Sequence, residues 1–437
     1  MQKLVFFLNT VCLIVFLLAA GVPGYAQAVN LKGRMEAMEQ KFNHHLGFSL
    51  YDPGKNETIF EYKSDKYFTP ASNTKIYTML ASLEVLGDSV PGLYYLERGD
   101  SLIIWGSGDP SFLYENTAQG KVLDFLQKSE KDIYLSYANF YDNHYGPNWA
   151  WDDFSWYYQV EKTSFPIYGN YLALEKDTGD MAPVVHNRVL GKYYMQKGSD
   201  NGENPLLRDY GIGFDEILEE EDEEIYKLAV PFKYTPALAA ELLSDTLHRP
   251  VYLTNTAISP DKKTIYSVHV DSLYQVLMQE SDNFIAEQLL LLCSGVLTDS
   301  LKSDIPIRHA TETFLADLPD EPVWVDGSGL SRYNLFTPRT MVAVWEKMYR
   351  KVPKERLFPM LAIGGEAGTI EKWYKGDRPY IYGKTGTLRN NHSLSGFLVT
   401  SKGSTLIFSF MHSNYTVFTS QIKKEMERIL LSIRDNY

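Results

Sequence analysis

The sequence has only two cysteines in 437 residues, and it has no excess of positive charge. Cys12 lies in the N-terminal apolar run, so the mature chain that we expect keeps only Cys293 and contains no intramolecular disulfide. Cys293, within AEQLLLLCSG, is interpreted as a small core residue. Lys and Arg number 42 against 55 Asp and Glu, which gives a net charge of −13. Such a chain lacks the basic surface that binds nucleic acid.

Motifs for metals and nucleotides are missing as well. The nine histidines include the neighbours His44 and His45 but no His-x-x-x-His spacing, and Cys293 has no cysteine partner with which to bind zinc. No glycine-rich nucleotide loop follows a predicted strand. We therefore expect no metal, no cofactor and no nucleic-acid partner, and the sequence identifies no protein partner.

Only one long apolar run is present, at the N-terminus. It extends from Leu4 to Ala20 after a single lysine, and the small-residue pattern Ala26-Gln27-Ala28 follows. This arrangement is typical of a cleaved secretory signal. An uncleaved membrane anchor is the alternative, because the run is nearly long enough to span a bilayer. We predict that residues 1–28 are a signal peptide cleaved near Ala28, and that the protein is exported to the periplasm or cell envelope.

The rest of the chain predicts an α/β fold with an insertion. Helical periodicity and a hairpin come first, and helices return later in the chain, followed by two alternating runs and a terminal helix. The intervening residues have short strands, aromatic clusters and the acidic run Asp215–Glu224, which we interpret as solvated. We expect a discontinuous domain of residues 29–87 and 235–437, interrupted at 88–234 by a mostly β region of one or two small domains.

A serine and a lysine lie three residues apart at the start of a predicted helix. The stretch TPASNTKIYTML contains Ser72 and Lys75, and this spacing places both on one helix face. A neutral lysine there can take the serine proton, and burial or a second cation nearby lowers a lysine pKa. The same spacing occurs at residues 259–262 and 420–423, where a loop proline and the polar face of an amphipathic helix indicate surface chemistry.

Two further motifs follow the serine–lysine pair along the chain. Ser281-Asp282-Asn283 lies in a break between two predicted helices, and Lys384-Thr385-Gly386 occurs once, in a predicted strand. The order Ser-x-x-Lys, Ser-x-Asn, Lys-Thr-Gly is the signature of penicillin-binding proteins and class A β-lactamases. Each motif alone is weak, but the three in this order indicate one acyl-transfer site.

Acyl-transfer chemistry explains the residue types. Ser72 would be the nucleophile and Lys75 its base, with Lys384 as the second cation that lowers the pKa of Lys75. Ser281 would relay the proton to the leaving amine, and Asn283 would hold the substrate amide. The predicted catalytic residues are Ser72, Lys75, Ser281, Asn283 and Lys384.

The strand that carries Lys384 is the predicted substrate-binding edge. Lys384, Thr385 and Thr387 would meet the terminal carboxylate of the substrate, with Gly386 between them. The backbone N–H groups of Ser72 and Thr387 would form an oxyanion hole, a feature often worth several kcal/mol of barrier.

The sequence resembles the D-Ala-D-Ala carboxypeptidases and endopeptidases of the S13 peptidase family, the class C low-molecular-mass penicillin-binding proteins. The resemblance implies a penicillin-binding-protein and serine β-lactamase-like transpeptidase domain with an inserted accessory region. Class A β-lactamases lack a long insertion between the first two motifs. Besides these motifs, the resemblance rests on GSGDPSF from Gly106, WAWDDFSWYY from Trp149, DGSGLSRYN from Asp326, GGEAGTI from Gly364 and LSGF from Leu394.

The resemblance implies a substrate and an inhibitor class. A peptidoglycan stem peptide would acylate Ser72, and β-lactams, as mimics of D-Ala-D-Ala, would acylate the same serine as covalent inhibitors. Asp152 or Asp153, together with Arg332, would grip the stem peptide's side chain. Alternatively the two aspartates cap a turn, and Arg332 pairs with a carboxylate at a domain interface.

Two departures and two alternatives remain. Glu366-Ala367 stands where members carry a short residue and an acid, so we assign that loop no catalytic role, and the insertion is short beside the longest members. A serine β-lactamase or esterase on the same scaffold is one alternative function. An inactive wall-binding protein is the other, although it would have no use for a serine–lysine pair.

Overall fold

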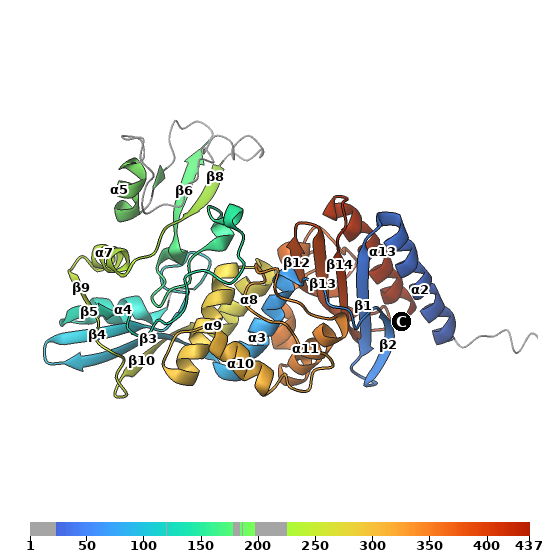
Figure 1. Cartoon of the computed structure of the whole chain (residues 1–437), viewed down its shortest axis with the longest axis horizontal. Helices are drawn as coiled ribbons and strands as arrows, with labels where there is room; N and C mark the ends of the chain where they lie inside the picture. The colour runs from blue at the N-terminus through green and yellow to red at the C-terminus, as the bar shows by residue number, and fades with distance from the viewer. Residues whose placement is uncertain (1–22, 119, 178–183, 186, 197–224) are drawn as a thin grey trace, which may run out of the picture.

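The computed structural model describes residues 23–437 except residues 119, 178–183, 186 and 197–224. The largest sheet has six antiparallel strands in the order β11-β12-β13-β14-β1-β2 (Figure 1). Strands from both ends of the chain therefore lie side by side in one sheet. The strands are β1 (His45–Asp52), β2 (Glu57–Tyr62), β11 (Ala362–Ile363), β12 (Ile381–Leu388), β13 (Asn391–Val399) and β14 (Thr405–Ser413).

Two helices from the ends of the described chain cover one face of this sheet. α2 (Pro23–Phe42) and α13 (Thr419–Asn436) pack together with the strands in one hydrophobic core, in which Met35 and Met426 are fully buried. Both helices present an apolar stripe to the sheet and polar residues to solvent. The predicted cleavage near Ala28 falls within α2 and stays a prediction.

The other face carries the helices that position the site. Their buried residues form the largest core with strand residues such as Phe397 and Ile407. The most central is α9, in which every residue from Phe284 to Gly295 is buried, the polar Glu287 and Gln288 included. This confirms Cys293 as a core residue. The helices are α3 (Thr74–Val85), α8 (Val270–Gln279), α9 (Asn283–Thr298), α10 (Asp304–Glu312), α11 (Pro338–Lys351) and the short α12 (Lys354–Leu357).

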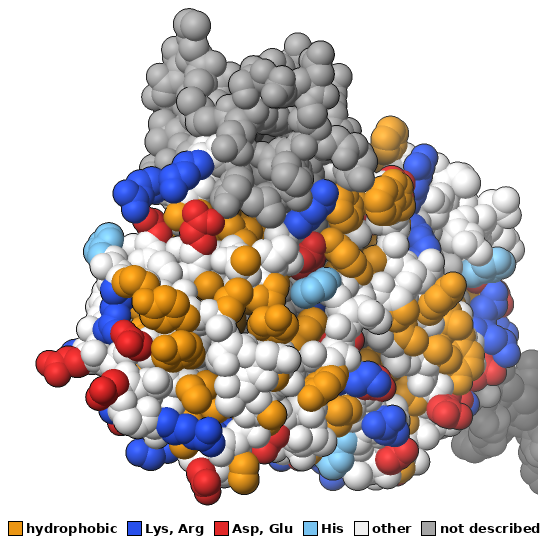
Figure 2. Space-filling view, turned by 60° about the vertical axis from the view of Figure 1, so that its left-hand side comes forward, with side chains coloured by type: hydrophobic (Ala, Val, Ile, Leu, Met, Phe, Trp, Pro, Cys, Tyr) orange, Lys and Arg blue, Asp and Glu red, His pale blue; other side chains and the backbone are white. Residues whose placement is uncertain are grey.

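A second sheet, of five strands, stands beside this helical layer. Its order is β10-β3-β4-β5-β9, with one face packed on α4 (Lys121–Lys128) and α7 (Pro236–Leu247). The other face carries a small cluster of Tyr94, Ile103 and Trp105. Figure 2, which brings this side of the molecule forward, shows hydrophobic side chains at the surface. The strands are β3 (Ser89–Arg98), β4 (Ser101–Gly106), β5 (Asp132–Ser136), β9 (Val251–Thr254) and β10 (Lys263–His269).

Two strands of this second sheet come after residue 234, the predicted end of the insertion. β9 and β10 pair with β5 and β3 respectively, and α7 packs in the same core. We therefore propose that the inserted region extends to about residue 269, where β10 ends and α8 begins. The 29–87 and 235–437 boundaries otherwise stay a prediction.

A small third sheet belongs to the inserted region as well. It has the order β7-β6-β8 and lies near α5 (Arg188–Gln196). The acidic run Asp215–Glu224 lies outside the described residues. In the described part of the chain, no helix combines the length and apolar character needed to cross a bilayer. The strands are β6 (Tyr171–Asp177), β7 (Val184–Val185) and β8 (Ile225–Pro231).

Candidate active site

Ser72 lies in a short 3₁₀ turn, Ala71–Asn73, directly before α3. Ala71 has a φ of +50°, a left-handed conformation that costs free energy for a residue with a side chain. Its carbonyl oxygen is covered by Gly329, where an added Cβ would lie 1.9 Å from that oxygen. Only glycine at 329 allows this approach, so the loop that contains it is held against the turn that carries Ser72.

Lys75, the second residue of α3 and one turn after Ser72, is completely buried. Its Nζ lies 2.9 Å from Ser72 Oγ, 2.5 Å from Asn283 Oδ1 and 2.7 Å from the Ser328 carbonyl oxygen. A neutral amine has two N–H donors and one lone pair. Because Asn283 Oδ1 and the Ser328 carbonyl can only accept, they take both N–H groups, and the lone pair is left facing the Ser72 hydroxyl. This is the arrangement that a base requires.

Burial supports the neutral form of this lysine. It lowers the pKa of Lys75 to about 8, although the negative charges of Asp282, Asp326 and Glu287 act in the opposite direction. The pKa of Lys384 lies well below its usual value because of burial and the charge of Lys75. We expected Lys384 to lower the pKa of Lys75. The repulsion between the two lysines is mutual, and in the structure it lowers the pKa of Lys384.

The second motif lies at the start of α9, against Lys75. Asp282 caps this helix by accepting a hydrogen bond from the Ile285 backbone N–H at 2.8 Å. Asn283 accepts from Lys75 and donates from Nδ2 to the Tyr158 carbonyl oxygen at 2.8 Å. Its amide is therefore engaged by the protein at both ends. Ser281 is partly exposed with a φ of +64°, and its hydroxyl makes no hydrogen bond within the described residues.

The third motif lies on β12, which packs on the start of α3. Asn73 Nδ2 donates to the Lys384 carbonyl oxygen at 3.1 Å, and a Cβ on Gly386 would lie 2.2 Å from the Pro70 carbonyl oxygen. Gly386 thus serves close packing here, and its contact with substrate stays a prediction. The Lys384 side chain has no exposed surface, and its Nζ donates to the Thr385 carbonyl at 3.0 Å. A direct contact between Lys384 and a substrate carboxylate therefore requires a local movement.

The other two threonines of the predicted binding edge differ in exposure, because Thr387 is exposed and Thr385 is buried. The Oγ1 of Thr387 lies 2.8 Å from His392 Nδ1. The Thr385 hydroxyl lies 2.7 Å from that of Thr369, which belongs to the loop that carries Glu366-Ala367. We assigned that loop no catalytic role, and its observed contribution is this contact with the binding strand.

Sequence reasoning missed Asp326, which organises the loop that holds Lys75. Its carboxylate is 1% exposed and accepts four hydrogen bonds. Oδ1 accepts from Gly329 N at 2.9 Å and Asn334 Nδ2 at 2.8 Å, and Oδ2 from Ser331 N at 2.7 Å and Trp149 Nε1 at 3.0 Å. The Asp-x-x-Gly pattern signals a turn but not burial.

Asp152, Asp153 and Arg332 lie on segments that border this site. Asp153 Oδ1 accepts from the Tyr158 hydroxyl at 2.8 Å, and the carbonyl of Tyr158 is the acceptor for Asn283. Asp152 and Arg332 are exposed, and among the described residues no ion pair joins them. Their role in gripping a stem peptide stays a prediction. Within the described part of the chain, no cluster of three or more His, Cys, Asp or Glu side chains could hold a metal ion.

Comparison with known proteins gives a consistent result. The family model described as D-Ala-D-Ala carboxypeptidase 3 (S13) matches residues 30–206 and 232–433. D-alanyl-D-alanine carboxypeptidase DacB of Haemophilus influenzae is 23% identical over 434 residues, which cover 88% of each chain. Penicillin-sensitive carboxypeptidase A of Dictyostelium discoideum is 21% identical over 455 residues, 87% of this chain and 85% of that protein.

Solved structures show the fold. The crystal structure of penicillin binding protein 4 from Haemophilus influenzae matches with a TM-score of 0.68 at 19% identity, covering 91% of this chain and 98% of that one. The same protein complexed with a β-lactam matches with a TM-score of 0.61 at 18% identity and the same coverage. The chain therefore has the α/β fold of penicillin-binding proteins, as predicted, with extra sheets.

Proposed function

The chain belongs to the D-Ala-D-Ala carboxypeptidase 3 (S13) family, and from this premise we propose that it is a serine-type D-Ala-D-Ala carboxypeptidase or endopeptidase acting on peptidoglycan stem peptides. The observation that carries the proposal is the 2.9 Å contact between Lys75 Nζ and Ser72 Oγ, with both amine N–H groups directed to other acceptors. A binding or scaffolding protein gains nothing from burying a lysine beside a serine, because burial of an amine is costly.

The proposed reaction has two halves. Ser72 Oγ attacks the carbonyl carbon of the penultimate D-alanine while its proton passes to the lone pair of Lys75. The oxyanion would accept from the backbone N–H groups of Ser72 and Thr387. The C–N bond then breaks, and the leaving amine takes a proton through the Ser281 hydroxyl. Water hydrolyses the resulting ester and restores Ser72.

The two relatives and the fold support the same inhibitor class. One curated relative is named as penicillin-sensitive, and the Haemophilus influenzae protein has been crystallised with a β-lactam. We propose that β-lactams acylate Ser72 of this chain and that the protein acts after export, in the periplasm or cell envelope. Thr385, Thr387, Asp152, Asp153 and Arg332 are the proposed substrate contacts, and Lys384 supports this edge from within.

Purified muropeptides test the function. Mass spectrometry after incubation with the protein should show loss of terminal D-alanine from pentapeptides or cleavage of cross-linked dimers, and Ser72→Ala should show neither. Unchanged muropeptides together with rapid turnover of a chromogenic β-lactam would instead indicate the β-lactamase alternative. Unchanged muropeptides without any acylation would indicate the inactive wall-binding protein.

A further inference from the structure

Glu287 is a buried acid on α9 that none of the motifs includes. It is 1% exposed, and its Oε1 accepts a hydrogen bond from the Ser328 backbone N–H at 2.8 Å. Its Oε2 is buried and has no hydrogen-bond partner among the described residues. Burying a charged carboxylate here costs free energy, because burial disfavours the charged form. The cost is reduced if the acid is protonated or if it holds another group by a hydrogen bond.

Ser328 connects this acid to the proposed base. The backbone N–H of Ser328 donates to Glu287, and its carbonyl oxygen lies 2.7 Å from Lys75 Nζ. The next residue, Gly329, donates to Asp326 Oδ1 at 2.9 Å, so carboxylates on two different elements hold this stretch of backbone. The orientation of the Lys75 amine therefore depends on a carbonyl that Glu287 fixes.

We propose that Glu287 is a positioning residue for acyl transfer, which holds Ser328 so that its carbonyl orients Lys75 and which adjusts, through its charge, the fraction of Lys75 that is neutral. This role rests on the proposed function, because it presumes that Lys75 is the base. Glu287 does not contact Ser72 or the substrate, so it acts only through Ser328 and Lys75.

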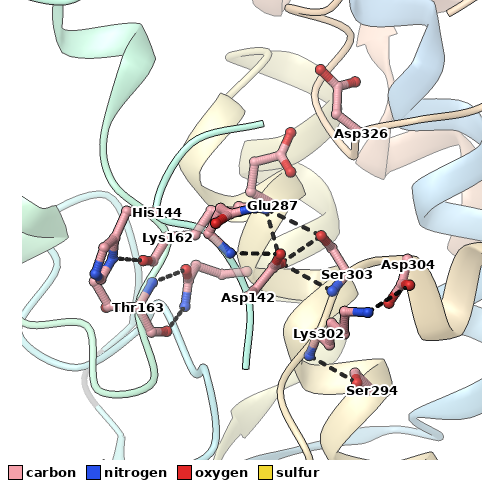
Figure 3. A network of polar contacts seen from close by, with 12 residues as sticks. Asp142, His144, Lys162, Thr163, Glu287, Ser294, Lys302, Ser303, Asp304 and Asp326 are labelled. Carbon is pink, nitrogen blue, oxygen red and sulfur yellow. Dashed lines mark hydrogen bonds and ion pairs between the residues drawn. The ribbon is translucent and has the colours of Figure 1, made fainter. Parts of the chain in front are cut away.

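The charges around Glu287 make its ionisation sensitive to pH. Figure 3 shows Asp326 on one side of Glu287 and Lys162 on the other. Burial and the charge of Asp326 raise the pKa of Glu287 to about 7, and the charge of Lys162 opposes this shift. Lys162 is itself paired with Asp142, at 2.9 Å. Besides Glu287, the charges of Asp282 and Asp326 act on Lys75, and Lys75 and Lys384 repel each other.

The negative charge of Glu287 determines the direction in which the pKa of Lys75 moves. An ionised Glu287 favours the protonated form of Lys75 and so raises the pKa of Lys75. Only the neutral amine can accept the Ser72 proton, so acylation of the wild-type protein should rise with pH, pass its midpoint near pH 8 and level off at higher pH. Removing the charge of Glu287 lowers the pKa of Lys75, and the rising part of the profile moves to lower pH.

Three variants separate the two parts of the role. Glu287→Gln keeps an acceptor for Ser328 but removes the charge, so its acylation rate on the high-pH plateau should stay within about threefold of wild type while the rise moves down by about 0.5–1 pH unit. Glu287→Ala removes the acceptor as well as the charge, and acylation on the high-pH plateau should fall by about tenfold or more. Glu287→Asp keeps the charge but is one methylene too short to reach Ser328, so its rate should fall while the position of the rise is kept.

The measurement is the second-order rate constant for labelling by a fluorescent penicillin between about pH 5.5 and 9.5. This range brackets the pKa values of Glu287 and Lys75. Circular dichroism checks that each variant is folded. Glu312→Gln, an exposed change on α10, is the matched control and should give the wild-type profile. A Glu287→Gln profile at the wild-type position, or Glu287→Ala at the wild-type rate, would overturn the proposal. If Glu287→Gln does not fold, an unimpaired Glu287→Asp overturns it.

A second readout does not depend on activity. NMR titration of protein carrying ¹³C-labelled lysine side chains, with the Lys75 signal identified by its loss in Lys75→Arg, should give a lower Lys75 pKa in Glu287→Gln than in wild type. An unchanged Lys75 titration contradicts the inference. A shifted titration in a protein that penicillin never labels retains the inference about the lysine and refutes the proposed function.

Discussion

Replacing Lys75 by alanine is expected to reduce acylation of Ser72 by about 10³-fold or more, because a positioned general base typically contributes factors of 10² to 10⁴. The protein should stay folded. Lys75 lies inside α3, where alanine is the most favourable residue, and the loss of a buried polar side chain creates no unpaired charge. Stopped-flow or gel-based labelling by a fluorescent penicillin gives the rate, and circular dichroism checks the fold.

The chain contains its own control for this substitution. Ser420 and Lys423 have the same spacing on α13, where Lys423 packs over the Trp373 ring. Lys423→Ala should leave the labelling rate unchanged. Normal labelling of Lys75→Ala would refute the assignment of Lys75 as the base, whatever the spacing of the two residues.

Replacing Asp326 by asparagine is expected to lower the free energy of unfolding by about 3 kcal/mol, although the two side chains have nearly the same shape. Each carboxylate oxygen of Asp326 accepts two N–H donors. In asparagine one of these oxygens becomes an NH₂ group, which would face two donors and satisfy neither. Because this loop holds the Ser328 carbonyl against Lys75, acylation should slow as well.

Urea unfolding followed by tryptophan fluorescence measures the stability of this variant. Asp124→Asn is the matched control, since Asp124 is 71% exposed and its only ion pair in the described structure is with Lys128 on the same helix. Such a surface pair is worth less than about 1 kcal/mol. An Asp326→Asn protein as stable as this control would show that the four hydrogen bonds contribute little.

The sequence predicted the parts of the fold that depend on local pattern. The apolar run of α9 and the alternation in β13 and β14 are strong signals for a buried helix and for strands. The order of the three motifs indicated one site, and the structure brings Lys75, Asn283 and the strand of Lys384 together around Ser72. These contacts join segments that are distant in sequence, so no single stretch could reveal them.

The buried charges could not be predicted in the same way. Asp326, Glu287 and Lys162 look like surface residues in the sequence, because acids and lysines are seldom fully buried. Their burial is explained only by partners that the fold supplies, such as the Ser328 backbone and Asp142.

The strands β9 and β10 were also missed in the sequence. β9 has only four residues, and nearly all residues of both strands are exposed or half-buried, so their pairing with β5 and β3 leaves little trace in the sequence.

Mapping the covalent adduct of a penicillin tests the central claim most directly. After incubation with the antibiotic, proteolysis and tandem mass spectrometry should locate one adduct per chain, on Ser72, and the adduct should be absent from Ser72→Ala. An adduct on a different residue, or a Ser72→Ala protein that is modified as readily as the wild type, would contradict the claim that Ser72 beside Lys75 is the site of acyl transfer.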